Sequence, residues 1–138
     1  MTKEIRRFML DTNMASYIIK GANNAVQERL ENVPMASVCI SAVTQAELLL
    51  GVAKKPDAKS LPMVVNEFLL RVEILPWGSQ AAQTYADLRT VFEKEGKSLG
   101  AMDMLIAAHA ASSGATLVTD DKAFYHVQNY LSLENWTI

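Results

Sequence analysis

Short apolar runs alternate with longer amphipathic stretches along this chain. The short runs are brief and mostly lack helical spacing, which indicates buried strands, whereas the longer stretches repeat their apolar residues at helical spacing. Strands are predicted at residues 8–10, 38–41, 72–75 and 116–119, with a possible edge strand within 131–136. Helices are predicted at residues 14–20, 24–31, 44–53, 61–70, 79–95 and 102–111.

Strands that alternate with helices are typical of an α/β fold. We therefore expect a three-layer domain in which a mainly parallel central sheet is flanked by helices on both faces. No repeat or linker interrupts the pattern, and the turn at residues 54–59 only separates two helices. Residues 1–138 are accordingly expected to form a single domain, with its ligand site beyond the carboxyl ends of the strands.

The composition is that of an ordinary globular protein. Half of the 138 residues are hydrophobic and 20% are charged, which excludes a disordered or collagen-like chain. No apolar run approaches the roughly 18 residues that cross a bilayer, so we expect no membrane segment. The first eight residues carry charges and no apolar stretch, so we expect no signal peptide.

The cysteine and charge content limit the kinds of metal site and of nucleic-acid binding that the chain can have. Cys39 is the only cysteine, so it is expected to be a buried, inert residue, in keeping with a reducing cytoplasm. With only His109 and His126 beside it, a cysteine-rich zinc site cannot form. The net charge of -2 argues against binding nucleic acid through a basic face alone, unless local basic residues or a bound cation offset the acids.

Several acidic residues occupy positions where a purely structural carboxylate is unusual. Asp11 follows the first predicted strand directly, and Asp120 and Asp121 follow the fourth. Glu47 and Asp103 lie among apolar neighbours in two predicted helices, where an unpaired charge is costly. In a parallel sheet these positions can meet at one edge. Carboxylates that meet stay ionised only around a hard cation, such as Mg²⁺ or Mn²⁺.

Each acid also has a purely structural interpretation. Asp11 is suited to cap the helix predicted at 14–20. Glu47 with Thr44 fits a capping box, and Asp103 fits the first turn of its helix, where the helix dipole favours a negative charge. The two acids after the fourth strand suit a turn. These interpretations explain each acid alone but not the set.

An acidic cluster with bound Mg²⁺ is suited to cleaving phosphodiesters, because the metal lowers the pKa of a bound water and neutralises the phosphate. The chain lacks the phosphate-binding loop, the serine-nucleophile turn and the paired-histidine zinc motif of other enzyme classes. Basic residues that we consider as phosphate contacts, or simply as solvated surface, are Arg6, Arg7, Lys54, Lys55, Lys59 and Lys97.

Five segments in this order and spacing give the chain a family resemblance that covers roughly residues 6–137. They are Phe8–Asn13, Ser41–Leu48, Gly100–Ala110, Gly114–Asp121 and Glu134–Trp136. The chain resembles the PIN-domain ribonucleases of the VapC toxin type. The resemblance implies a PIN-like fold and a Mg²⁺-dependent endoribonuclease, with Mn²⁺ as a possible substitute.

The resemblance also implies which residues form the site. Asp11, Glu47 and Asp103 match the acidic metal site, and Asp121 matches a fourth, more variable acid. Many relatives carry Thr-Asn-Asn where this chain carries Thr119-Asp120-Asp121, which leaves open whether Asp120 or Asp121 serves. Asn13 and Thr119 match small polar residues that support the metal ligands.

The resemblance further implies RNA cleavage, commonly of transfer RNA or ribosomal RNA, a homodimer, and inhibition by a VapB-type antitoxin. The motifs around Asp103 and Trp136 resemble the subgroup that cuts initiator transfer RNA in the anticodon stem-loop. Two alternatives remain: a non-catalytic module that binds RNA or protein, and a Mg²⁺-dependent phosphatase. A phosphatase would usually carry Asp-x-Asp, whereas the residue two after Asp11 is Asn13.

Three apolar segments carry more apolar residues than one helix face requires. They are residues 48–50, 63–65 and 68–70. They are expected either to pack in the core or to line a groove for a second subunit or for the antitoxin.

Overall fold

The computed structural model describes residues 6–138, and their strands form one parallel sheet. The strand order is β3-β2-β1-β4-β5, and every neighbouring pair is parallel. This confirms the expected α/β architecture. The strands are β1 (Phe8–Leu10), β2 (Val38–Ser41), β3 (Glu73–Leu75), β4 (Thr116–Val118) and β5 (Leu133–Glu134).

The helices follow the sequence pattern closely, with three differences. The helices predicted to start at Met14 and Thr44 each begin two residues earlier, at Thr12 and Ala42, and a short helix that the pattern had not bounded follows β4. The helices are α1 (Thr12–Lys20), α2 (Asn24–Glu31), α3 (Ala42–Ala53), α4 (Leu61–Arg71), α5 (Ser79–Lys94), α6 (Ala101–Ser112) and α7 (Lys122–Tyr125). Single 3-10 turns lie at Met35–Ser37 and Gln128–Tyr130.

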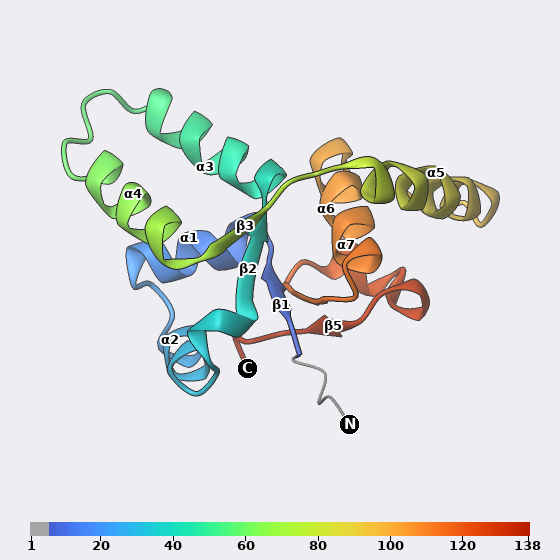
Figure 1. Cartoon of the computed structure of the whole chain (residues 1–138), viewed down its shortest axis with the longest axis horizontal. Coiled ribbons are helices and arrows are strands. Elements are labelled where there is room, and N and C mark those ends of the chain that lie inside the picture. Colours follow the sequence, from blue (N-terminus) through green and yellow to red (C-terminus); the bar gives the residue numbers. More distant parts are fainter. Residues whose placement is uncertain (1–5) are drawn as a thin grey trace.

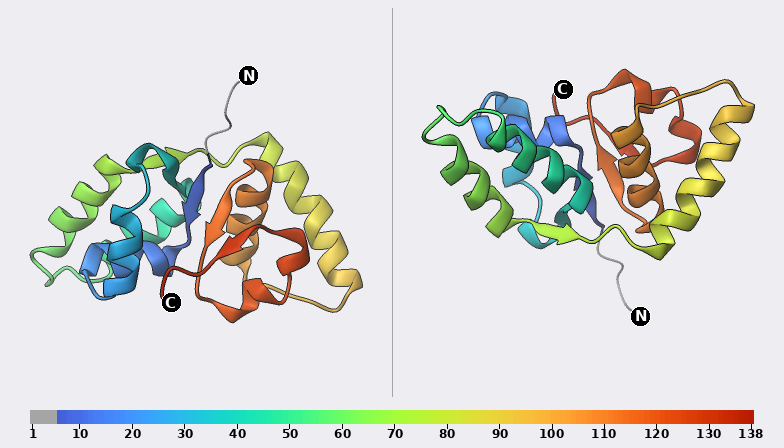
Figure 2. Two further views of the ribbon diagram at one scale, coloured as in Figure 1. Left: turned by 90° about the horizontal axis from the view of Figure 1, so that it is seen from below. Right: turned by 90° about the horizontal axis from the view of Figure 1, so that it is seen from above.

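Successive residues of β1 point to opposite faces of the sheet and into two separate hydrophobic cores. Phe8 and Leu10 pack on the face covered by α1 and α4, whereas Met9 packs against α6 on the other face. Figures 1 and 2 show helices α1–α4 gathered at one end of the molecule and α5–α7 at the other. Strands β1, β2 and β4 are buried on both faces, which explains their mostly apolar sequences.

The chain changes direction across the sheet at β1. From β1 it adds β2 and then β3 on one side, and it returns to add β4 and β5 on the other. The carboxyl ends of β1 and β4 therefore form a topological switch point, where open α/β sheets bind their ligands. Asp11 and Thr119 are the residues that follow these two strands.

The Glu134–Trp136 segment anchors the end of the described chain to the sheet. Trp136 is buried and packs edge-on against Phe8, with ring centroids 5.5 Å apart. Its indole N–H donates to Glu134 at 3.0 Å, and Glu134 also pairs with Arg6 and Arg29. This motif therefore has a structural role.

Cys39 lies in the core between the sheet and α6, as expected. Burial raises the pKa of its thiol to about 12, which keeps it protonated and unreactive. Within residues 6–138, none of the helices combines the length and the apolar character needed to cross a membrane.

Candidate active site

Three of the acids predicted from the sequence, Asp11, Asp120 and Asp121, lie at the switch point of the sheet. Asp11 follows β1, and its backbone N–H donates to Val118 at the end of β4, 3.1 Å away. Asp120 and Asp121 continue from the same end of β4. The charges of Asp103 and Asp120 both raise the pKa of Asp11, so three elements bring carboxylates to one place.

Asp11 serves both as a helix cap and as a member of this cluster. Its Oδ1 accepts the N–H of Met14 at 2.8 Å at the start of α1, so the capping interpretation is correct. Burial raises the pKa of Asp11 to about 6; hydrogen bonds from the Thr119 hydroxyl and the Met14 N–H oppose this rise, and the neighbouring acids add to it. The carboxylate is 4% exposed, so its charge depends strongly on its surroundings.

Asp103 connects the remaining acids. It lies half-buried in the first turn of α6, where the helix dipole favours its charge, as the structural interpretation held. Burial raises its pKa first, and the charges of Asp121 and Glu47 raise it further. Asp103 therefore interacts with Asp121 and Glu47, which are not among the acids that raise the pKa of Asp11. Through Asp11 and Asp103 together, all five acids are linked electrostatically.

Glu47 is held by a threonine that the sequence analysis did not single out. The Thr12 hydroxyl donates to Glu47 Oε1 at 2.6 Å and lies 3.3 Å from the Thr44 hydroxyl. The alternative in which Thr44 and Glu47 form a capping box is wrong, because Ser41 caps α3 and its Oγ accepts the N–H of Val43. Thr44 lies within the helix.

Asp120 and Asp121 are held by different partners. The Tyr17 hydroxyl on α1 donates to Asp120 Oδ2 at 2.9 Å. Asp121 caps α7 through its Oδ1, which accepts the N–H of Ala123 at 2.9 Å, so the turn interpretation also describes it. Both acids are half-buried, and each adds its charge to a different member of the pair formed by Asp11 and Asp103.

The two predicted supporting residues differ in their surroundings. Thr119 is fully buried; its hydroxyl hydrogen-bonds Asp11 and accepts the N–H of Asp121 at 3.0 Å, so it links two acids. Asn13 is exposed, and its side chain has no hydrogen bond among the described residues. Its supporting role stays a prediction. Thr12 and Tyr17 make contacts of the kind expected of Asn13.

Basic side chains do not neutralise this cluster. Throughout residues 6–138, none of the acids Asp11, Glu47, Asp103, Asp120 and Asp121 forms an ion pair. Of the basic residues considered as phosphate contacts, Arg6, Arg7 and Lys97 pair with other glutamates. The local charge is therefore strongly negative and favours a bound cation.

The donor chemistry of the cluster fits a hard divalent cation, but its geometry is open. In the part of the chain that the structure describes, no three acid, histidine or cysteine side chains converge closely enough to hold one ion together. Mg²⁺ commonly uses one or two carboxylates and fills its remaining positions with water and substrate phosphate. The arrangement suits that kind of binding and not an all-protein cage.

Both histidines lie outside the cluster. His109 is buried on α6 and bonds Ser41, and His126 is exposed beyond α7. A serine–histidine–aspartate hydrolase therefore has no support among the described residues, since His109 contacts Ser41 but forms no hydrogen bond or ion pair with an acid there.

Comparison with known proteins identifies similar chains. The profile of the PIN domain family matches residues 8–130. The tRNA(fMet)-specific endonuclease VapC of Shigella flexneri is 32% identical over 95% of this chain and 98% of its own length. Ribonuclease VapC2 of Rickettsia felis is 37% identical over 94% of this chain and 97% of its own length. The DNA-bound VapBC structure from Salmonella typhimurium superposes with a TM-score of 0.86 at 32% identity, covering 95% of this chain and 98% of the other.

Proposed function

This chain belongs to the PIN-domain family of VapC ribonuclease toxins, and we propose that Asp11, Glu47, Asp103 and Asp121 form its Mg²⁺-dependent catalytic centre. One observation carries this proposal. The charges of acids at the end of β4 and on helices α3 and α6 raise the pKa of Asp11 at the end of β1 or of Asp103 on α6. No basic side chain within residues 6–138 forms an ion pair with any of these acids.

The residues divide the work between binding and orientation. Asp11 and Asp103 are the pair best placed to hold the ion, with Glu47 and Asp121 completing the negative site. Thr119 and Thr12 fix the carboxylates of Asp11 and Glu47 through their hydroxyls. Bound Mg²⁺ supplies an activated water and neutralises the phosphate. Hydrolysis by water is expected to leave 3′-hydroxyl and 5′-phosphate ends.

The proposed substrate is transfer RNA. The similar protein from Shigella flexneri is named as specific for tRNA(fMet), and the chain matches it over nearly its full length. We extend this to initiator transfer RNA cut in the anticodon stem-loop. Phosphates reach the site only where the carboxylates are offset by a cation, because this face carries uncompensated negative charge.

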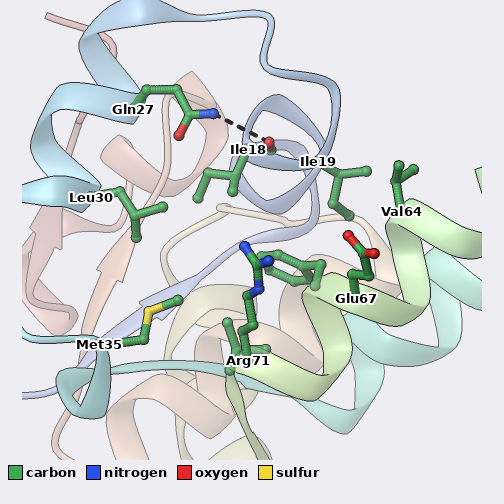
Figure 3. A pocket seen from close by; sticks show the side chains of 10 residues that line it. Ile18, Ile19, Gln27, Leu30, Met35, Val64, Glu67 and Arg71 are labelled. Atoms are coloured by element: carbon green, nitrogen blue, oxygen red, sulfur yellow. Dashed lines mark hydrogen bonds between the residues drawn. The ribbon is translucent and has the colours of Figure 1, made fainter.

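A VapB-type antitoxin is proposed to occupy the groove between α1, α2 and α4. Figure 3 shows this groove with apolar side chains along its floor and the Glu67 and Arg71 side chains among them. Its volume is about 220 Å³. An amphipathic helix could bury apolar side chains here and pair its charges with Glu67 and Arg71. The other lining residues are Ile18, Ile19, Gln27, Leu30, Met35, Val64, Phe68 and Val72.

A separate apolar surface on α3 and α4 is proposed as the homodimer contact. The three apolar segments of the sequence divide in the structure: Leu48, Val65 and Phe68 are core residues. Their neighbours stand out in solvent, with Leu70 87% exposed and Met63 65% exposed. Exposed apolar side chains in this number favour a protein contact. The remaining exposed members of this surface are Leu49 and Leu50, whereas Val64 lines the groove described above.

The experiment that tests the catalytic proposal is incubation of the purified chain with total RNA, with and without Mg²⁺, followed by end mapping. We expect one discrete Mg²⁺-dependent cut that is lost in Asp103→Asn. Binding of RNA without turnover would favour a non-catalytic module. Hydrolysis of phosphomonoesters but not RNA would favour the phosphatase alternative.

A further inference from the structure

A buried hydrogen bond joins the two helices that carry Asp103 and Glu47. His109 on α6 and Ser41 at the start of α3 lie 68 residues apart, and His109 Nδ1 is 2.7 Å from Ser41 Oγ. Ser41 is fully buried and His109 is 4% exposed, so water does not replace either partner. Neither residue belongs to the acidic cluster.

Ser41 makes two hydrogen bonds through its hydroxyl. Its Oγ accepts the N–H of Val43 at 3.1 Å as the cap of α3, which leaves one proton and one lone pair for His109. Burial lowers the pKa of His109, which favours the neutral ring, and the tautomer of that ring decides which of the two atoms donates. The same hydroxyl thus caps α3 and ties it to α6.

The positions of the two residues on their helices allow this bond to affect the separation of Glu47 and Asp103. Ser41 lies six residues before Glu47, and His109 lies six residues after Asp103. At a rise of 1.5 Å per residue, the bond lies about 9 Å along each helix from its acid. Like charges on Glu47 and Asp103 repel, and the buried bond holds the helices together against that repulsion.

We propose that His109 is a positioning residue, whose bond to Ser41 sets the separation of Glu47 and Asp103 and thereby the affinity of the site for its divalent cation. This inference rests on the proposed catalytic centre. It predicts that the loss of one hydrogen-bonding atom, about 9 Å along the helix from the carboxylate, weakens metal binding without disturbing contacts to RNA.

Asparagine and glutamine replacements form a matched pair for testing this proposal. The Asn side chain can place its Oδ1 or its Nδ2 where His carries Nδ1, whereas Gln places its amide one bond further out. His109→Asn therefore keeps a hydrogen-bond partner for Ser41 in either direction, and His109→Gln and His109→Leu do not. Binding of Mn²⁺ to the RNA-free protein is measured by titration calorimetry, and kcat and KM by transfer RNA cleavage.

We expect His109→Gln and His109→Leu to weaken Mn²⁺ binding and lower kcat by about 10- to 100-fold, as for other residues that orient metal ligands. KM for RNA should stay unchanged, and His109→Asn should remain close to the wild type. Wild-type Mn²⁺ affinity in His109→Leu, or equal losses in the Asn and Gln variants, would overturn the proposal. Asp103→Asn tests the proposed catalytic centre separately from the role of His109. If this variant binds Mn²⁺ normally, the catalytic centre itself is wrongly assigned.

Discussion

The hydroxyl of Tyr17 donates a hydrogen bond to Asp120 Oδ2 at 2.9 Å. This bond turns the carboxylate of Asp120 toward α1 and gives it a fixed partner. The neighbouring Asp121 instead adds its charge to Asp103, and the Asp120 charge acts on Asp11. Two adjacent acids at the end of β4 therefore have different environments, which separates their expected roles.

We predict that Asp121, not Asp120, is the fourth acid of the site. Asp121→Asn should lower the cleavage rate by about 100-fold or more, since it removes several kcal/mol of charge stabilisation. Asparagine still caps α7, so the fold is kept. Asp120→Asn keeps an acceptor for the Tyr17 hydroxyl and only weakens a charge-assisted hydrogen bond, so it should cost roughly 2- to 10-fold. Single-turnover cleavage of transfer RNA compares the two, and the reverse order would assign Asp120.

Replacing Asp103 should separate activity from stability. Asp103→Asn keeps the shape of the side chain but removes a charge that burial and two neighbouring acids destabilise. Cutting should fall by about 100-fold or more, while the thermal midpoint of the metal-free protein stays the same or rises. Cleavage assays and thermal melts in EDTA measure both. A fully active variant would contradict the assignment of Asp103.

The Thr12 hydroxyl is expected to matter through Glu47. Thr12→Val keeps the shape but removes the donor 2.6 Å from Glu47 Oε1. We expect metal affinity and kcat to fall by about 10- to 100-fold, as when other outer partners of metal ligands are lost. Thr12→Ser retains the hydroxyl and is the control. If valine and serine behave alike in Mn²⁺ titrations, the hydrogen bond has no role in the site.

Much of the fold could be predicted because β1, β2 and β4 are buried on both faces, so their sequences are short and mostly apolar. The start of α3 was misplaced because Ser41 ends a strand and caps a helix at once. The bounds of α7 escaped prediction because four residues carry too little periodicity.

The acids could be predicted from their places at strand ends and in apolar helices, but their polar partners could not. Thr12 and Asn13 are adjacent small polar residues in the first turn of α1, and only the orientation of that helix decides which one reaches Glu47. Tyr17 reads in sequence as one more residue of an amphipathic helix. Its bond to Asp120 spans 103 residues and depends on the packing of α1 beside β4.

The raised pKa of Asp11 should make the metal-free protein less stable as the pH rises. Burial raises this pKa from 3.8 to about 6, so between these values the folded protein keeps a proton that the unfolded chain has lost. The free energy of unfolding should therefore fall by about 2 kcal/mol from pH 4 to pH 6, out of a total of about 3 kcal/mol at 1.36 kcal/mol per pKa unit.

Asp11→Asn supplies the control for this effect, because asparagine caps α1 equally well and does not titrate. Urea unfolding in EDTA, from pH 4 to pH 7, should show a decline in the wild type that is absent from the variant. Added Mg²⁺ or Mn²⁺ should restore stability at pH 7 only in the wild type, because the ion binds the ionised carboxylate. If the free energy of unfolding depends on pH in the same way in both proteins, ionisation of Asp11 does not destabilise the fold, contrary to the expectation from its burial.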